Sequence, residues 1–133
     1  MKKDLQVYQE NKKSIGRFFK SFKYAFQGMR YAFYHEKNLI VMFVIAIITI
    51  TLGIVLKISY GEGLVIVLLI GMVMALEMVN SAIEVVVDMH DKNQRSEKGK
   101  IAKDCACSAV GLMSIIALVV GLMIFIPKII ALF

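Results

Sequence analysis

The chain has 133 residues, of which 59% are hydrophobic and 20% charged, with a mean hydropathy of +0.72. Soluble domains are about 45–50% apolar, and a globule of this length cannot bury so large an apolar excess in water. The composition therefore predicts a single integral membrane domain over residues 1–133. It disfavours disordered, collagen-like and disulfide-stapled secreted chains. Despite a net charge of +6, it also disfavours a nucleic-acid partner.

The first predicted element is an amphipathic surface helix over residues 14–36. Its apolar residues recur at helical spacing: Ile15, Phe18, Phe19, Phe22, Phe26, Met29 and Phe33. Polar and basic residues occupy the other side: Arg17, Lys20, Lys23, Gln27 and Arg30. A helix of this kind lies in the bilayer interface and contacts anionic membrane lipids. We expect Ser14 to cap it and residues 2–13 to be frayed, and a purely anchoring role is the alternative.

Three apolar stretches predict transmembrane helices at about 38–57, 63–88 and 104–126, which makes the fold an all-α membrane protein. Residues 38–56 and 105–127 carry no charge, and each is long enough for the roughly 17–25 residues that cross a bilayer. The middle stretch is also apolar, but two glutamates, an asparagine and a serine interrupt it.

The distribution of Lys and Arg predicts the orientation of the chain. Residues 1–37 contain nine Lys or Arg and three acids, and residues 88–104 contain five more Lys or Arg. The short turn between the first two spans contains Lys57 and Glu62. Because positive residues favour the cytoplasmic side, we expect the N-terminus and the loop at 89–103 to be cytoplasmic and the C-terminus to be outside.

The middle span contains the side chains that point to chemistry. Glu77, Asn80, Ser81, Glu84 and Asp88 occupy positions i, i+3, i+4, i+7 and i+11, a spacing that places all five on one face of a helix. Ionisable side chains at membrane depth cost at least a few kcal/mol, so they are rare and usually functional. The alternative is a seam of hydrogen bonds between helices, which normally uses Ser, Thr or Asn.

The carboxylates of this row can serve two different chemical roles. A buried glutamate such as Glu77 suits a general base or a proton-coupled site. Glu84 is nearer the predicted cytoplasmic side and can hold Mg²⁺, which is commonly shared with nucleotide phosphates. Lys103 and Asp104 begin the third span at the same level, where Lys103 can neutralise phosphate charge.

Several other patterns are uninformative or missing. Cys105 and Cys107 stand two residues apart, which favours neither a disulfide nor a zinc site, so we expect small packing residues there. His35 and His90 have no cysteine nearby and suggest no histidine-based metal site. The sequence has no P-loop, no protein-kinase catalytic loop and no nucleophile elbow.

A family resemblance rests on the middle span and on the beginning of the third span. The run from Glu77 to Asp88, then Ala-Lys-Asp at 102–104 and Ser-Ala-Val at 108–110, resembles the signature of the prokaryotic diacylglycerol kinase family of integral membrane lipid kinases. The likeness extends to residues of the predicted surface helix: Arg17, Lys20, Tyr24, Gly28, Arg30 and Glu36. It covers nearly the whole chain from about residue 14.

The resemblance implies a homotrimer in the bacterial cytoplasmic membrane that transfers the γ-phosphoryl group of Mg-ATP to a lipid alcohol, in sites shared between subunits. It implies Glu77 as the general base with Asn80 beside it, and Glu36 and Glu84 as ligands of Mg²⁺. The residues it implies for ATP binding are Arg17, Tyr24, Glu36, Glu84, Lys103 and Asp104. Those it implies for the lipid substrate are Arg17, Glu77 and Cys107. Phosphoryl transfer needs such positioning and charge neutralisation more than covalent chemistry.

The nature of the lipid is predicted from details of the resemblance. The segments 101–104 and 125–128 look more like the Gram-positive branch of the family, whose members are similar to undecaprenol kinases. We therefore expect undecaprenol as acceptor, giving undecaprenyl phosphate, with diacylglycerol as the alternative. The loop at 89–101 is slightly longer than the Gram-negative pattern and has Gln94, Arg95 and Ser96 where many members have a histidine.

A function of a different class is a proton-coupled small transporter or a cation channel subunit, because intramembrane acids also mark ion pathways. This hypothesis accounts for Glu77. It leaves Glu36 and Lys103 without a role, so the lipid kinase is the favoured prediction.

Overall fold

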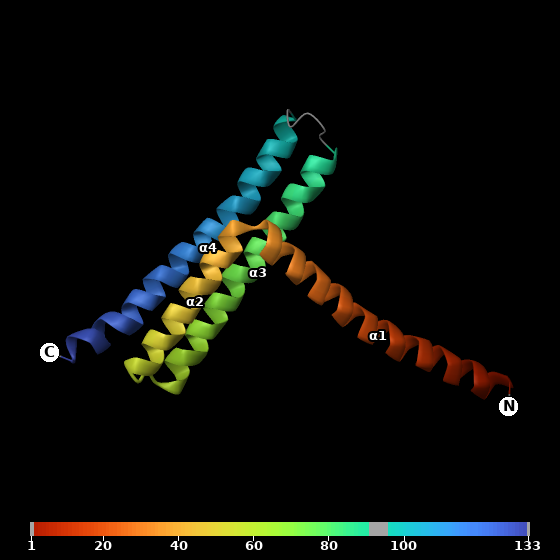
Figure 1. Cartoon of the computed structure of the whole chain (residues 1–133), viewed down its shortest axis with the longest axis horizontal. Helices are drawn as coiled ribbons and strands as arrows, with labels where there is room; N and C mark the ends of the chain where they lie inside the picture. The colour runs from red at the N-terminus through yellow and green to blue at the C-terminus, as the bar shows by residue number, and fades with distance from the viewer. Residues whose placement is uncertain (1, 91–95, 133) are drawn as a thin grey trace. The chain divides into compact units, whose positions relative to one another are not determined.

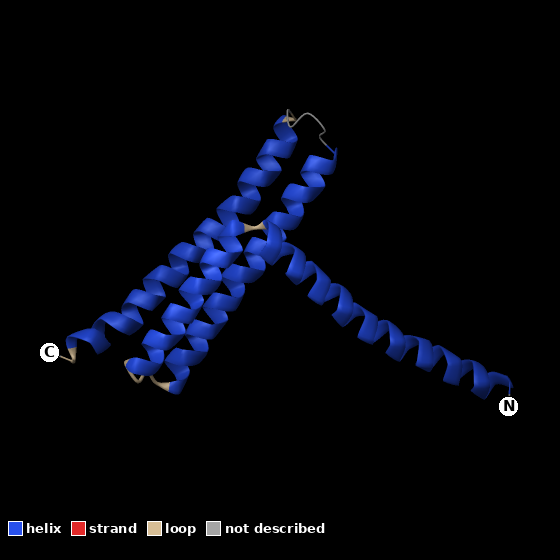
Figure 2. Cartoon of the chain, viewed as in Figure 1, coloured by secondary structure: helices blue, strands red, loops and turns tan. Residues whose placement is uncertain are grey.

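The computed structural model describes residues 2–90 and 96–132, with side chains from residue 16 onward. Four helices follow one another along the chain (Figure 1): α1 (Lys2–His35), α2 (Lys37–Val55), α3 (Tyr60–His90) and α4 (Glu97–Ile130). The described residues contain no strand (Figure 2). The predicted all-α fold is therefore confirmed. The chain forms two units, residues 1–35 and residues 36–133.

The first unit is helix α1, which is longer at its start than the sequence pattern predicts. The helix begins at Lys2, so Ser14 lies inside it instead of capping it. The apolar periodicity starts at Ile15, but the polar segment before it is rich in Lys, Gln and Glu, which have high helix propensity. Farther along, the rings of Phe18 and Phe22 meet edge to face at 5.1 Å, as residues four apart on a helix can.

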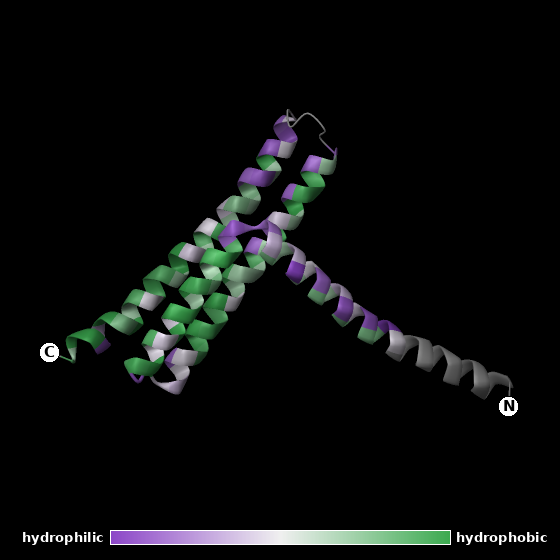
Figure 3. Cartoon of the chain, viewed as in Figure 1, coloured by the Kyte–Doolittle hydropathy of each residue, from purple (hydrophilic) through white to green (hydrophobic). Residues whose placement is uncertain are grey.

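Helices α2, α3 and α4 of the second unit are each long and apolar enough to cross a membrane. They contain 19, 31 and 34 residues. At a rise of 1.5 Å per residue, 31 residues measure about 46 Å, more than the roughly 30 Å of a hydrocarbon core. The apolar residues occupy the middle of these helices, and the polar residues gather at the ends of α3 and α4 that extend beyond the start of α2 (Figure 3). The protein is a multi-pass membrane protein.

Helix α3 is the central element of this unit, because it packs against both α2 and α4. The buried apolar side chains come from all three helices: Leu39, Ala46, Ile66, Val110, Met113 and Phe125. Many large apolar side chains on α2, α3 and α4 remain exposed in the single chain, including Ile48, Leu68 and Leu118. These side chains are available to lipid or to other protein surfaces.

The turn between α2 and α3 explains why α2 ends at Val55, earlier than the predicted boundary of 57. Lys57 has a left-handed φ of 51°. Its N–H donates to the carbonyl of Ile54, and the N–H of Ile58 donates to the carbonyl of Gly53, both at 3.1 Å. This is a Schellman motif. A Cβ atom on Gly53 would lie 2.8 Å from Cδ1 of Ile58, so glycine leaves room for the isoleucine to fold back over the helix end.

Reciprocal hydrogen bonds begin α3. The N–H of Ser59 donates to Oε2 of Glu62 at 2.7 Å, and the N–H of Glu62 donates to Oγ of Ser59 at 3.3 Å, which together form a capping box. The same Oε2 atom lies 3.4 Å from Nζ of Lys128 on α4. At the other end of α4, Oγ of Ser96 accepts from the N–H of Gly99 at 3.2 Å. Helices α3 and α4 therefore begin earlier than predicted, at Tyr60 and Glu97.

Candidate active site

A row of polar side chains runs along α3, and its burial decreases toward the end of the helix. Glu77, Asn80 and Ser81 are 3%, 8% and 6% exposed, and they are the buried polar residues of the described chain. Glu84 is half-buried and Asp88 is exposed. Because helix geometry places these positions on one face, the row leads from the interior of the unit to its surface.

Hydrogen bonds fix part of this row. Nδ2 of Asn80 donates to Oε1 of Glu84 at 3.3 Å, and Oγ of Ser81 donates to the backbone carbonyl of Glu77 at 3.0 Å. Oδ1 of Asn80 is buried and has no hydrogen-bond partner among the described residues. A buried acceptor without a partner costs about 1–3 kcal/mol. This atom is therefore a ready acceptor for a donor that enters the site.

An ion pair connects the surface end of this row to α4. Nζ of Lys103 lies 2.5 Å from Oδ1 of Asp88, and the two side chains are 30% and 44% exposed. Asp104 follows Lys103 and is exposed, and its backbone carbonyl accepts from Oγ of Ser108 at 2.7 Å. The structure thus brings Lys103 to the residue one helical turn beyond Glu84. Sequence reasoning placed Asp88 in the row but assigned it no role.

The predicted magnesium ligands can be judged by the donors that they offer. Glu36 is the N-cap residue of α2, and its side chain makes no cap hydrogen bond. Glu84 is half-buried, and one of its oxygens accepts from Asn80. Within residues 2–90 and 96–132, no three His, Cys, Asp or Glu side chains gather into a cation site made by protein alone. Mg²⁺ in nucleotide sites uses one or two carboxylates with waters and phosphates, and each of these two glutamates offers a donor of that kind.

The remaining predicted site residues lie on two different helices. Arg17 and Tyr24 are exposed residues of α1 in the first unit, and their contacts with ATP and lipid remain predictions. Cys105 and Cys107 are both exposed on α4. They therefore do not fill the core of the single chain, and the packing role expected for them stays a prediction. Gln94 and Arg95 lie outside the described residues.

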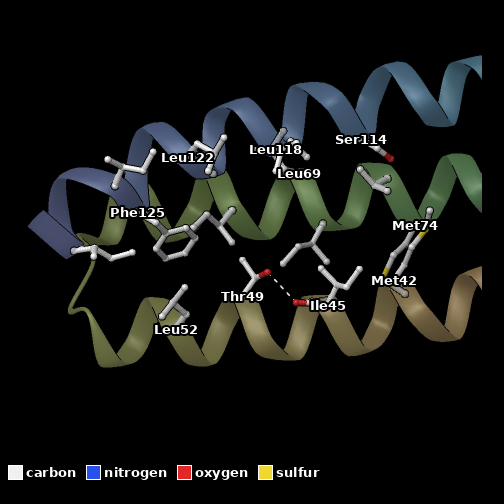
Figure 4. A pocket seen from close by; sticks show the side chains of 18 residues that line it. Met42, Ile45, Thr49, Leu52, Leu69, Met74, Ser114, Leu118, Leu122 and Phe125 are labelled. Carbon is white, nitrogen blue, oxygen red and sulfur yellow. Dashed lines mark hydrogen bonds between the residues drawn. The ribbon is translucent and has the colours of Figure 1, made fainter.

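A cavity of about 530 Å³ lies among α2, α3 and α4 (Figure 4). Its walls are almost entirely apolar. Residues from α2 that line it include Met42, Ala46 and Leu52, and residues from α4 include Gly121, Leu122 and Phe125. Thr49 also lines it, but its hydroxyl already donates to the carbonyl of Ile45 at 2.8 Å, as the dashed line in Figure 4 shows.

The cavity continues the face of α3 that carries the polar row. The α3 residues that line it are Ile66, Leu69, Ile70, Val73 and Met74. Met74 comes three residues before Glu77, and residues three and four apart are neighbours on a helix. One face of α3 therefore changes from apolar cavity wall to buried carboxylate at Glu77. Cavities of about 300–1,000 Å³ with apolar walls and a few polar groups are typical of ligand sites. No sequence signal had indicated this cavity.

Comparisons with known proteins show the family. The family model described as prokaryotic diacylglycerol kinase matches residues 23–125. An undecaprenol kinase from Bacillus subtilis (strain 168) is 36% identical over 121 residues, which cover 90% of this chain and 97% of the relative. The chain belongs to the prokaryotic diacylglycerol kinase family.

A second relative extends the comparison. A diacylglycerol kinase from Synechocystis sp. is 37% identical over 112 residues, which cover 84% of this chain and 64% of the relative. The chain thus spans less than two thirds of that relative. The predicted family and the predicted enzyme class, a lipid kinase, are confirmed. A kinase of this family uses a nucleotide as phosphoryl donor.

Proposed function

We propose that the protein transfers the γ-phosphoryl group of Mg-ATP to the hydroxyl of undecaprenol, giving undecaprenyl phosphate. The observation that carries this proposal is the face of α3 on which an apolar cavity wall gives way to the buried carboxylate of Glu77. A lipid alcohol changes from apolar to polar in the same way, since its hydrocarbon chain ends in a hydroxyl. The undecaprenol kinase of B. subtilis supports the prenol, because the match covers 97% of that protein.

Diacylglycerol is the second candidate acceptor. The match to the diacylglycerol kinase of Synechocystis sp. favours it at nearly the same identity, 37%. Either alcohol presents a primary hydroxyl, so the catalytic residues would act in the same way on both.

In the proposed reaction, Glu77 is the general base. With the lipid chain in the cavity, the hydroxyl lies beside Glu77, whose carboxylate accepts the hydroxyl proton as the oxygen attacks the γ-phosphorus. The bond from the γ-phosphorus to the β–γ bridging oxygen breaks, and ADP leaves. Oδ1 of Asn80 is buried without a partner among the described residues and accepts a hydrogen bond from a group in the site. Its Nδ2 atom donates to Glu84 and so holds that carboxylate in place.

The nucleotide would bind where the polar row reaches the surface. Glu36 and Glu84 would hold Mg²⁺, which neutralises charge on the phosphates. Lys103 would contact the phosphates as a point cation, with Asp104 beside it. As the family resemblance implies, Arg17 and Tyr24 would also contact ATP, and Arg17 and Cys107 would contact the lipid.

The proposal includes a location and an assembly. The N-terminus and the loop at 89–103 would face the cytoplasm, where ATP is present, in the cytoplasmic membrane of a bacterium. The C-terminus would lie outside. A homotrimer with shared sites would cover part of the apolar surface that a single chain leaves exposed on α2, α3 and α4.

A competition assay tests the proposed acceptor. The purified protein in lipid receives Mg-ATP labelled in the γ-phosphate, with equal amounts of undecaprenol and diacylglycerol. We expect the label mainly on undecaprenol. Dominant labelling of diacylglycerol would make the protein a producer of phosphatidic acid, and absence of label from both would contradict both proposed acceptors.

A further inference from the structure

Ion pairs between described residues join helices α3 and α4 toward both ends. Asp88 pairs with Lys103 at one end, and Glu62 pairs with Lys128 at the other, where the distance is 3.4 Å. Each pair consists of one carboxylate on α3 and one lysine on α4. The pairs differ in their surroundings. Asp88 follows Glu84 by one helical turn in the polar row, whereas Glu62 lies in the first turn of α3 and belongs to its capping box.

Stability alone does not explain the Asp88–Lys103 pair. Both side chains are partly exposed, at 44% and 30%. Exposed ion pairs contribute little to folding because water and salt screen them and because holding two long side chains costs entropy. The pair has a different consequence, since it fixes the position of one ammonium group beside a row of acidic side chains.

We propose that Asp88 is a positioning residue that acts through Lys103 and holds its ammonium group where the nucleotide phosphates bind. This inference rests on the proposed function, which places the phosphates beside Glu84 and Lys103. Lysine is a point charge on a flexible four-carbon stem. Removing the Asp88 carboxylate takes away a contact that holds the ammonium, which then meets the phosphates less of the time. With Asp88 in place, Lys103 is restricted to the end of the row before ATP arrives.

The geometry gives Asp88 a contact between two helices. Its carboxylate accepts from the ammonium group of Lys103 on α4, fifteen residues farther along the chain. Asn80 and Glu84 pair with each other within α3. Asp88 therefore links the nucleotide end of the row to the helix that supplies the cation.

A double-mutant cycle in the full-length protein tests this role. Asp88→Asn keeps the size of the side chain and removes its charge. We expect it to raise the KM for Mg-ATP and the equilibrium dissociation constant of ATP about five- to tenfold. An effect of this size is typical of two residues in contact that act together. The KM for the lipid stays unchanged, and Asp88→Glu restores most of the ATP affinity. In a Lys103→Met background, Asp88→Asn causes no further loss of ATP binding, because Asp88 acts through Lys103.

Glu62→Gln is the matched control, since it removes the equivalent pair at the other end of the same two helices. It should leave ATP affinity unchanged. An Asp88→Asn variant with normal ATP affinity would overturn the inference. A further loss in the Lys103→Met background would show that Asp88 contacts the nucleotide or its cation directly, and would overturn it as well. If the wild-type protein bound ATP but labelled no lipid, the proposed function would fail while the cycle could still be measured by ATP binding.

Discussion

Asn80 links the buried and the exposed parts of the polar row, because its Nδ2 atom donates to Oε1 of Glu84 at 3.3 Å while its Oδ1 atom remains buried without a partner among the described residues. The amide is therefore oriented, with its donor side toward the carboxylate proposed to hold Mg²⁺. Its acceptor side is left for a group that enters the site. One residue can thus affect both the cation and the acceptor alcohol.

Replacing Asn80 should therefore disturb magnesium use. In Asn80→Ala, Glu84 loses its hydrogen-bond donor, and we expect the Mg²⁺ concentration for half-maximal activity to rise about tenfold, the order for one hydrogen bond to a charged group. A magnesium titration of lipid phosphorylation measures this change. Ser81→Ala is the control, since the Ser81 hydroxyl donates to a carbonyl of its own helix. Equal effects of the two variants would contradict the assigned role.

Glu77→Gln should remove the general base while keeping a side chain of the same size. We expect kcat to fall about 10²- to 10⁴-fold, the typical contribution of general base catalysis. Membrane insertion, oligomer size and ATP affinity should be retained, as measured by size-exclusion chromatography and nucleotide binding. Unchanged kinase activity in this variant would rule out Glu77 as the base.

Glu36→Gln and Glu84→Gln test the two proposed magnesium ligands separately. Loss of one carboxylate should shift the magnesium titration to higher concentration by roughly tenfold or more, because Mg²⁺ in such sites uses few protein ligands. Oligomer size should not change. A variant with a normal magnesium response would remove that residue from the metal site.

Two glycines of α4 allow a matched test of the cavity. Gly121 lines the cavity and Gly111 does not, and a Cβ atom added at either position meets nothing within 4 Å. Gly121→Leu should place a side chain in the space proposed for the lipid chain. We expect the KM for undecaprenol to rise about tenfold, with the KM for Mg-ATP and the rate on a short, soluble prenol unchanged.

Gly111→Leu makes the same chemical change outside the cavity, and it should leave the KM for undecaprenol near the wild-type value. Thermal unfolding of both variants checks that neither substitution prevents folding. An equal rise in KM for both glycine variants would show that the cavity does not hold the chain.

Much of this organisation is predictable from sequence because it depends on local periodicity. Uninterrupted apolar runs identify α2 and α4, and the spacing from Glu77 to Asp88 places the polar residues on one face of α3. The ends of the helices are harder to predict. Lys57 adopts a left-handed conformation that few residues other than glycine favour, and the cap at Ser96 lies well before the apolar run of α4.

The cavity and the pairing between α3 and α4 depend on tertiary contacts, which the sequence does not reveal. The cavity depends on the sizes of side chains that three helices bring together, and no single helix encodes it. The pairing of Lys103 with Asp88 depends on the register between α3 and α4. That register is set by packing along both helices, which periodicity within either one does not specify.

The decrease in burial from Glu77 to Asp88 has a consequence for the energetics of the proposed reaction. Burying one CH₂ group is worth about 0.8 kcal/mol, so extracting a long prenol chain into water would be prohibitive. Along α3, the hydrocarbon can stay at bilayer depth while its hydroxyl lies at the point where the helix becomes polar. The helix would thus let a water-soluble donor and a water-insoluble acceptor react without either leaving its own phase.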